Sequence, residues 1–285
     1  MTTTWRIKIF SDYCTPKAAR DDFSSSCFAE NQPFYGEGKD FVFTILDDYT
    51  HAIILNKAMP KLNIPKERVI GLAQEPIPFL RLNDEFISYA QQYIGKYYVS
   101  DKGNLPDPFI EGNAFIYYYR PFPDVKKPNL ISIMVSNKAF SSGHTYRHHL
   151  VQRILQTNLP IDIWGRGCFI YERTKDPRLK GNFKMYEPYT GYKYHIAIEN
   201  FETNYYFSEK IINPLLLGTV PIYLGCKNID KFFPNQYVKL TGNLDIDMNI
   251  LELLCIMPEH YMKTIDIPGV ENKVNLLKNM KSLFS

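Results

Sequence analysis

The sequence predicts an α/β protein of two domains. Three observations support this class: the chain length, the alternation of strand-like and helical runs, and one clear strand–helix–strand unit. At 285 residues, the chain is longer than a usual domain of about 100–150 residues. Apolar residues make up 45% of it, which is typical of a globular protein. Each half is therefore expected to bury a core of its own.

The clearest unit covers residues 194–225. Its first strand has the period of two that β-strands show, with apolar positions at Tyr194, Ile196 and Ile198. Ser208 is placed to cap a following helix. The apolar positions of that helix have i, i+3, i+4 spacing: Ile211, Ile212, Leu215 and Leu216. Gly218 ends the helix, and residues 220–224 form the second strand.

This unit also predicts where a ligand binds. A strand–helix–strand unit forms a parallel sheet, and open parallel sheets bind ligands beyond the carboxyl ends of their strands. The polar residues that fall at that edge are Asn200, Tyr206, Glu209 and Lys210. One residue disturbs the pattern, because Pro214 lies inside the predicted helix. The helix therefore either bends there or begins later than the Ser208 cap indicates.

Other elements are predicted on both sides of a proline-rich segment, residues 120–130, which we interpret as an interdomain linker. Strand-like runs precede it at 5–10, 41–45, 51–55, 69–73, 97–100 and 114–119. After it, strands are predicted at 130–135, 161–164 and 236–240, and helices at 145–156 and 274–284. We therefore expect an N-terminal domain over residues 1–125, a second domain over 126–270, and a C-terminal helix within 271–285.

Charge and composition argue against several classes. The net charge is only +3, so a nucleic-acid partner is not expected. No run approaches the roughly 20 apolar residues that cross a bilayer, and the N-terminus resembles a strand more than a signal peptide. The cysteines are odd in number and form no CxxC pair, so reduced thiols in the cytoplasm are expected. They are Cys14, Cys27, Cys168, Cys226 and Cys255.

The same unit carries a longer pattern: IEN at 198–200, YFSEK at 206–210 and GTVPIYLG at 218–225. This pattern resembles the donor-binding signature of the family 10 glycosyltransferases, the α-1,3/4-fucosyltransferases, and the chain is similar to their soluble bacterial and viral type. Ile198 stands where the family usually has Phe. The resemblance implies the GT-B architecture, in which two Rossmann-like domains face a central cleft. The nucleotide sugar then binds the C-terminal domain, and the acceptor approaches from the N-terminal one.

The activity implied by the resemblance is an inverting transfer of fucose from GDP-fucose to a glycan hydroxyl, in an α-1,3-type linkage. Lys210, in the first helical turn, and Arg147, near the start of the helix at 145–156, are expected to hold the donor phosphates. The alternative interpretation is that each is an ordinary surface cation, as Arg153 is expected to be. Asn200, Tyr206 and Glu209 are implied as further donor-binding residues.

A general base is expected from the N-terminal domain, where Glu75 follows the strand at 69–73. The resemblance implies this role, and the alternative is a surface loop acid. For Glu199 we expect a structural role in orienting the turn after the strand.

No metal is expected to be required, because Arg147 and Lys210 can neutralise a diphosphate. Asp245 and Asp247 form a D-x-D pattern, but they resemble a helix N-terminus more than a metal site. His144, His148 and His149 are interpreted as neutral, exposed histidines around one helix start.

Two other functions remain open. The first keeps the fold and uses a UDP-sugar, as an exostosin-like xylosyl or other transferase would. The second is a catalytically inactive protein that binds a sugar nucleotide. The YFSEK cluster favours the fucosyl interpretation over the first. The acceptor and the linkage cannot be identified from the sequence.

Overall fold

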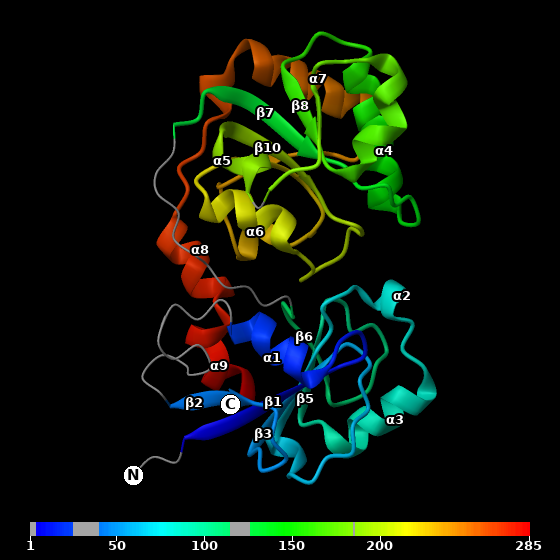
Figure 1. The fold of residues 1–285 in the computed structure, drawn as a ribbon, viewed down its shortest axis with the longest axis vertical. Coiled ribbons are helices and arrows are strands. Elements are labelled where there is room, and N and C mark those ends of the chain that lie inside the picture. Colours follow the sequence, from blue (N-terminus) through cyan, green and yellow to red (C-terminus); the bar gives the residue numbers. More distant parts are fainter. Residues whose placement is uncertain (1–3, 25–39, 115–125, 185) are drawn as a thin grey trace. The chain divides into compact units, whose positions relative to one another are not determined.

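The computed structural model describes residues 4–24, 40–114, 126–184 and 186–285. Contacts between Cα atoms divide the chain into two units (Figure 1). Unit 1 consists of Met1–Pro121, Thr203–Tyr206 and Glu271–Ser285, and unit 2 of Phe122–Glu202 and Phe207–Val270. Within the described ranges, no helix combines the length and the hydropathy needed to span a membrane.

Unit 1 is built on a six-stranded sheet with the order β2-β1-β3-β4-β5-β6, in which every pairing is parallel. Its strands are β1 (Trp5–Ser11), β2 (Phe41–Thr44), β3 (His51–Leu55), β4 (Val69–Leu72), β5 (Lys96–Val99) and β6 (Phe109–Glu111). Its helices are α1 (Pro16–Ser24), α2 (Ile77–Leu80), α3 (Asp84–Tyr93) and α9 (Leu276–Phe284), with a 3₁₀ turn at Lys66–Arg68.

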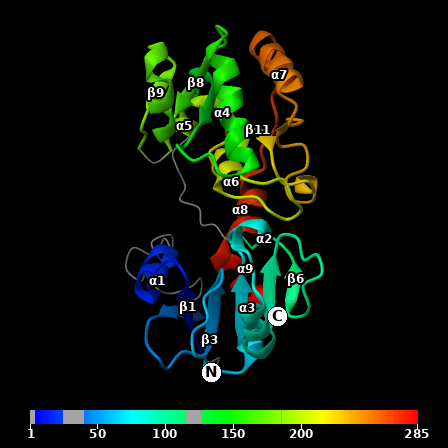
Figure 2. The same cartoon turned by 90° about the vertical axis from the view of Figure 1, so that its right-hand side faces the viewer.

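Both faces of this sheet are buried, as parallel sheets require. Along β3, Ile53 and Leu55 pack into one cluster with Met280 of α9, while Ala52 and Ile54 pack into another with α3. The C-terminal helix α9, red in Figures 1 and 2, therefore completes the core of unit 1.

Unit 2 has a second six-stranded parallel sheet, with the order β12-β11-β10-β7-β8-β9. Its strands are β7 (Asn129–Met134), β8 (Ile161–Trp164), β9 (Leu179–Gly181), β10 (Tyr192–Ile198), β11 (Val220–Leu224) and β12 (Val238–Lys239). Its helices are α4 (Ser142–Leu155), α5 (Glu187–Thr190), α6 (Glu209–Leu216) and α7 (Leu244–Ile256), and α8 (Ile267–Val274) begins in unit 2 and ends in unit 1. Shorter 3₁₀ segments lie at Arg166–Thr174, Ile229–Lys231 and Pro258–Tyr261.

This strand order is that of a Rossmann fold, and it reverses direction between β7 and β10. Helices α4 and α7 share one hydrophobic cluster with the sheet, while α5 and α6 contact β10. Ligands of open α/β sheets bind where the strand order reverses, outside the carboxyl ends of the strands. A ligand of unit 2 is therefore expected to bind at the segments that follow β7 and β10.

Most predicted elements of the described ranges are present, and the differences have local causes. Helix α4 begins three residues early because the Ser141 side chain accepts a hydrogen bond from the His144 N–H and caps it. The helix predicted at 274–284 begins two residues later, as α9, because Asn275 caps it through the Lys278 N–H, and α8, which was not predicted, precedes it. The strand predicted at 236–240 is reduced to the two residues of β12.

The helix of the predicted strand–helix–strand unit begins at Glu209, as the Ser208 cap indicates, and Pro214 lies inside it. Gly218 then follows α6 in the left-handed region, with φ of 62°. The strand predicted at 114–119 and the linker predicted at 120–130 lie largely outside the described residues.

A close backbone approach fixes α4 against the turn after β10. The Gly143 N–H donates to the Asn200 carbonyl at 3.1 Å. A Cβ atom on Gly143 would lie 1.8 Å from the Glu199 carbonyl oxygen. Only glycine leaves room for this contact, because both partners are backbone.

We therefore expect Gly143→Ala to destabilise unit 2 by about 1–3 kcal/mol, because α4 or the turn must shift to admit the methyl group. The measurement is the Tm of the purified variant. Gly191→Ala is the matched control, since Gly191 has φ of −91° and its Cβ would meet only the Asn129 amide at 3.5 Å. Equal Tm values for both variants and the parent would contradict the steric argument.

Candidate functional site

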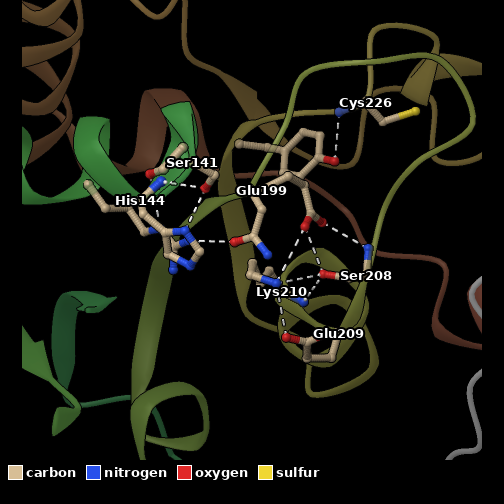
Figure 3. A network of polar contacts seen from close by, with 11 residues as sticks. Ser141, His144, Glu199, Ser208, Glu209, Lys210 and Cys226 are labelled. Atoms are coloured by element: carbon tan, nitrogen blue, oxygen red, sulfur yellow. Dashed lines mark hydrogen bonds and ion pairs between the residues drawn. The ribbon is translucent and has the colours of Figure 1, made fainter. Parts of the chain in front are cut away.

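Four of the predicted site residues come together where the strand order of unit 2 reverses. Asn200 follows β10, and Arg147 lies on α4, which follows β7. Glu209 and Lys210 are the first two residues of α6. Figure 3 shows this region, in which the side chains converge from the end of β10, the start of α4 and the start of α6.

Arg147 is held by the segment that follows β10. Its side chain is buried, Nη2 donates to Asn200 Oδ1 at 2.8 Å, and Nε donates to the Gly143 carbonyl at 3.3 Å. Arg147 is thus not the surface cation of the alternative interpretation. Arg153, on the same helix, does behave as one: its side chain is 44% exposed and pairs with Asp245.

A buried carboxylate organises the start of α6. Glu199 is 1% exposed and accepts two hydrogen bonds from Ser208, from the backbone N–H at 2.8 Å and from the hydroxyl at 2.7 Å. The Lys210 ammonium lies 3.6 Å from the same carboxylate and donates to Ser208 Oγ and Glu209 Oε1, both at 3.0 Å. The predicted role of Glu199 in orienting the turn is confirmed, whereas its ion pair with Lys210 carries no local sequence signal.

The charges of this cluster influence one another. Burial raises the pKa of Glu199, and the Lys210 ammonium and the Ser208 hydrogen bonds only partly oppose that rise. For Lys210, burial disfavours the charged form, but the Glu209 and Glu199 carboxylates outweigh it and raise the pKa. The Arg147 charge acts in the opposite direction on Lys210. Two cations are therefore held near each other, with carboxylates balancing their repulsion.

His144 corrects one prediction, because it is buried and not exposed. Its ring nitrogen Nδ1 is hydrogen-bonded to the Ser141 hydroxyl (Figure 3). Burial, followed by the charges of Arg147 and Lys210, lowers its pKa to about 4, so the imidazole is neutral at pH 7. Of the other two histidines, His148 is half-buried against Tyr171 and His149 is exposed. A serine directly before a helical run was the signal that marks this helix start.

The carboxylate of Asp247, in the D-x-D pattern, is hydrogen-bonded to other residues of the chain. It accepts from Thr241 N–H and Oγ1, from the Gly242 N–H and from the Tyr146 hydroxyl. It therefore closes the loop before α7, as the helix-start interpretation predicts. Among the described residues, no group of three or more His, Cys, Asp or Glu is arranged to hold a metal ion.

Two predicted residues lie elsewhere. Tyr206 is buried and belongs to Thr203–Tyr206, the segment whose contacts group with unit 1. Glu75 follows β4 of unit 1 and lines a pocket there. Of the residues predicted to bind the donor, the structure therefore gathers Arg147, Asn200, Glu209 and Lys210 in unit 2.

Comparison with curated proteins finds fucosyltransferases. A putative fucosyltransferase-like protein of Arabidopsis thaliana is 27% identical over 127 residues, or 43% of this chain and 23% of its own length. GDP-fucose protein O-fucosyltransferase 3 of Danio rerio is 27% identical over 50% of this chain and 32% of its own length. α-(1,3)-Fucosyltransferase B of Drosophila melanogaster is 35% identical over 29% of this chain and 20% of its own length. The chain thus spans less than a third of these relatives.

Solved structures show the same fold. A crystal structure of an α1,3-fucosyltransferase with GDP-fucose superposes with a TM-score of 0.57 at 14% identity, covering 99% of this chain and 90% of that one. The structure of Anabaena Alr3699/HepE in complex with UDP-glucose superposes with a TM-score of 0.54 at 10% identity, covering 83% of this chain and 78% of that one. The predicted GT-B architecture is thereby confirmed. Residues 125–242 match the family model described as glycosyltransferase family 10 (fucosyltransferase), C-terminal. These residues enclose the cluster around Glu199, so the part of the chain that holds the candidate site is similar to the C-terminal domain of that family.

Proposed function

We propose that this protein is an inverting fucosyltransferase that transfers fucose from GDP-fucose to a glycan hydroxyl in an α-1,3-type linkage. The observation that carries the proposal is the pair of cations, Arg147 and Lys210, held where the strand order reverses in a domain similar to that of family 10. The names of the relatives, which include a GDP-fucose protein O-fucosyltransferase and an α-(1,3)-fucosyltransferase, support the donor. The protein acts in the cytoplasm in this proposal, as an odd number of cysteines without a CxxC pair predicts.

The donor diphosphate binds at the N-terminus of α6 in this proposal. Backbone N–H groups and the helix dipole favour an anion there. Lys210 supplies a point charge, and the planar Arg147 guanidinium supplies paired donors that match phosphate oxygens. Asn200 fixes the direction of the guanidinium through the 2.8 Å hydrogen bond.

Glu209 accepts hydrogen bonds from sugar hydroxyl groups of the donor in this proposal. Its side chain is 42% exposed and bonds Lys210 at 3.0 Å. A carboxylate accepts two hydrogen bonds from a vicinal diol, as the ribose offers. When phosphate oxygens replace Glu209 on Lys210, the carboxylate becomes available for that diol. Tyr206, immediately before Phe207 and Ser208, is the remaining donor residue of the proposal.

Transfer occurs in a single displacement. Glu75 takes the proton of the acceptor hydroxyl, and the acceptor oxygen bonds to C1 of fucose from the face opposite the leaving group. The bond between C1 and the β-phosphate oxygen breaks, and GDP leaves with the electron pair. Arg147 and Lys210 stabilise the negative charge that develops on the diphosphate, so the mechanism requires no metal ion.

The fold does not decide between donors, because UDP-sugar enzymes superpose nearly as well as fucosyltransferases. The donor is therefore tested by thermal shift in the presence of a chelator, with GDP, GDP-fucose, GDP-mannose, UDP-xylose and UDP-galactose. We expect GDP and GDP-fucose to raise the Tm by mass action, and transfer to persist in the chelator. Stabilisation by a UDP-sugar alone would replace the fucosyl assignment, and loss of transfer in the chelator would reject the metal-free mechanism.

Substitution separates the donor residues from the base. Lys210→Ala and Arg147→Ala are each expected to lower kcat/KM by about 10²–10³-fold, because each removes a donor to the leaving diphosphate. Both should also weaken GDP binding. Glu75→Gln is expected to lose transfer but bind GDP as the parent does. Arg153→Ala, which removes an exposed arginine of the same helix, is the control. Parent-like turnover in Lys210→Ala and Arg147→Ala would remove the donor-site assignment.

The raised pKa of Glu199 predicts a pH-dependent stability. A raised folded-state pKa stabilises the fold fully below the ordinary glutamate value, and this stabilisation is lost as pH rises through the raised value. Glu199→Gln has no such titration. The Tm of the parent minus that of Glu199→Gln should therefore fall as pH rises from about 4 to about 8.

Glu209→Gln is the comparison variant, and its Tm difference from the parent is expected to change with pH in the opposite direction. Burial raises the pKa of Glu209, but the Lys210 charge and the hydrogen bonds to Lys210, Ser208 and its own backbone together outweigh it, so the net shift is downward. The parent should gain Tm relative to this variant as pH rises. A parent-minus-Glu199→Gln difference that is independent of pH would contradict the raised pKa.

A further inference from the structure

The positive charge of the chain is concentrated in one stretch of unit 2. Residues 166–184 include six basic and two acidic side chains, a net charge of +4, whereas the whole chain has +3. The remainder of the chain is therefore slightly acidic overall. The stretch runs from the 3₁₀ segment after β8 through β9, the edge strand of the unit 2 sheet (Figure 2). A local concentration of cations attracts an anionic partner.

Four of these cations form no ion pair with a carboxylate among the described residues. Arg178 is paired with Asp176 at 2.7 Å, and Lys180 with Asp162 at 3.3 Å, so their charges are offset within the fold. The other four are exposed: Arg166, Arg173, Lys175 and Lys184. Within the stretch, Glu172 is the acidic residue that remains to oppose them. The surface is therefore positive toward any partner that approaches it.

Large apolar side chains are exposed among the same cations. Phe169 is 57% exposed and Ile170 is 46% exposed. Both lie in the 3₁₀ segment, between Arg166 and Arg173. Phe183, which follows β9, is 38% exposed. Exposed apolar side chains that lie together in this way are typical of an interaction surface.

The inner side of the 3₁₀ segment fixes this exposure. The Gly167 N–H donates to the Val135 carbonyl at 3.0 Å, which ties the segment to the end of β7. Tyr171 is buried, and its hydroxyl is hydrogen-bonded to His148 Nδ1 at 2.6 Å. Because the inner positions are filled, the two exposed apolar side chains of the segment are held in solvent by the fold.

Charge and apolar surface together select the partner. A second copy of the chain would bring the same positive charge and would be repelled. A nucleic acid would satisfy the cations, but it offers little hydrocarbon surface to bury an aliphatic side chain such as Ile170. An anionic membrane offers both, because its headgroups attract Lys and Arg while the boundary with the acyl chains buries Phe and Ile.

We propose that residues 166–184 form a docking surface for an anionic lipid membrane. Phe169 and Ile170 enter the boundary between headgroups and acyl chains, and Arg166, Arg173 and Lys184 contact the headgroups. Binding is weak and reversible, because only a few side chains enter the lipid. The inference does not rest on the proposed function, since none of the candidate donor residues lies in this stretch.

The test is co-sedimentation of the full chain with vesicles of phosphatidylcholine, alone or mixed in equal parts with phosphatidylserine. We expect binding to the mixed vesicles only. Added salt should weaken it, because salt screens the contacts with the headgroups. Arg166→Gln and Arg173→Gln should each weaken binding about five-fold, the effect of one cation near an anionic surface.

Insertion is measured separately from electrostatic adsorption. Phe169→Ala should weaken binding about ten-fold, because less apolar area leaves water. In Phe169→Trp, the new indole should shift its emission to the blue with mixed vesicles, against the background of Trp5 and Trp164 in the parent. Two control variants should bind as the parent does. Ile256→Ala removes a side chain that is 75% exposed on α7, and Lys227→Gln removes an exposed cation outside the stretch.

All these variants should keep the Tm of the parent, because the substituted side chains are exposed. Absence of binding to mixed vesicles overturns the proposal, as does equal binding to both kinds of vesicle. Parent-like binding by Arg166→Gln, Arg173→Gln and Phe169→Ala overturns it as well.

Other occupants would also be recognised. A uridine oligonucleotide that binds through Arg166 and Arg173, without binding to vesicles, would overturn the proposal in favour of a nucleic acid. A dimer in light scattering that Phe169→Ala dissociates would overturn it in favour of a second copy. If GDP and GDP-fucose fail to bind while the mixed vesicles bind, the fucosyl donor is wrong and the docking surface remains.

Discussion

The arrangement of the candidate site depends on one buried carboxylate. Glu199 continues β10 and accepts both hydrogen bonds from Ser208, so it fixes the first residue before α6 to the end of the strand. Two glycines leave room for Glu199. A Cβ on Gly143 would lie 1.8 Å from the Glu199 carbonyl oxygen, and a Cβ on Gly225 would lie 2.4 Å from the Glu199 Cγ. A buried carboxylate without partners is strongly unfavourable. Strand, turn and helix are consequently constrained to one geometry.

This constraint also explains how two cations are held in a small region. Arg147 and Lys210 repel each other, but Glu199 and Glu209 offset that repulsion on the side of α6, and Asn200 accepts from the guanidinium on the side of α4. The cations are therefore oriented before any anion arrives. Preorganised charge of this kind needs little rearrangement when negative charge develops, which is the property that phosphate-leaving reactions use.

The strand–helix–strand unit was predictable because its signals are local: alternation in β10, a serine cap, and Gly218 after α6. The contacts that make the site were not, because they join distant positions. Arg147 and Asn200 are 53 positions apart and meet only because β7 and β10 are neighbours in the sheet. His144 is buried for the same reason, since α4 docks on the turn after β10. Periodicity marks the core face of a helix and does not reveal such a contact at its end.

Helix α9 has a consequence for how fast unit 1 folds. Met280 is fully buried in a core of unit 1, Phe284 packs edge-on against Trp5, and the Tyr98 hydroxyl donates to the Leu283 carbonyl. Strands β1 and β3 and helix α9 share this core although the whole of the unit 2 sheet lies between them in the sequence. Contacts of such high sequence separation carry a large loop-closure entropy. The core of unit 1 on this face therefore forms slowly, and changes in α9 should destabilise strands that are far from it in the sequence.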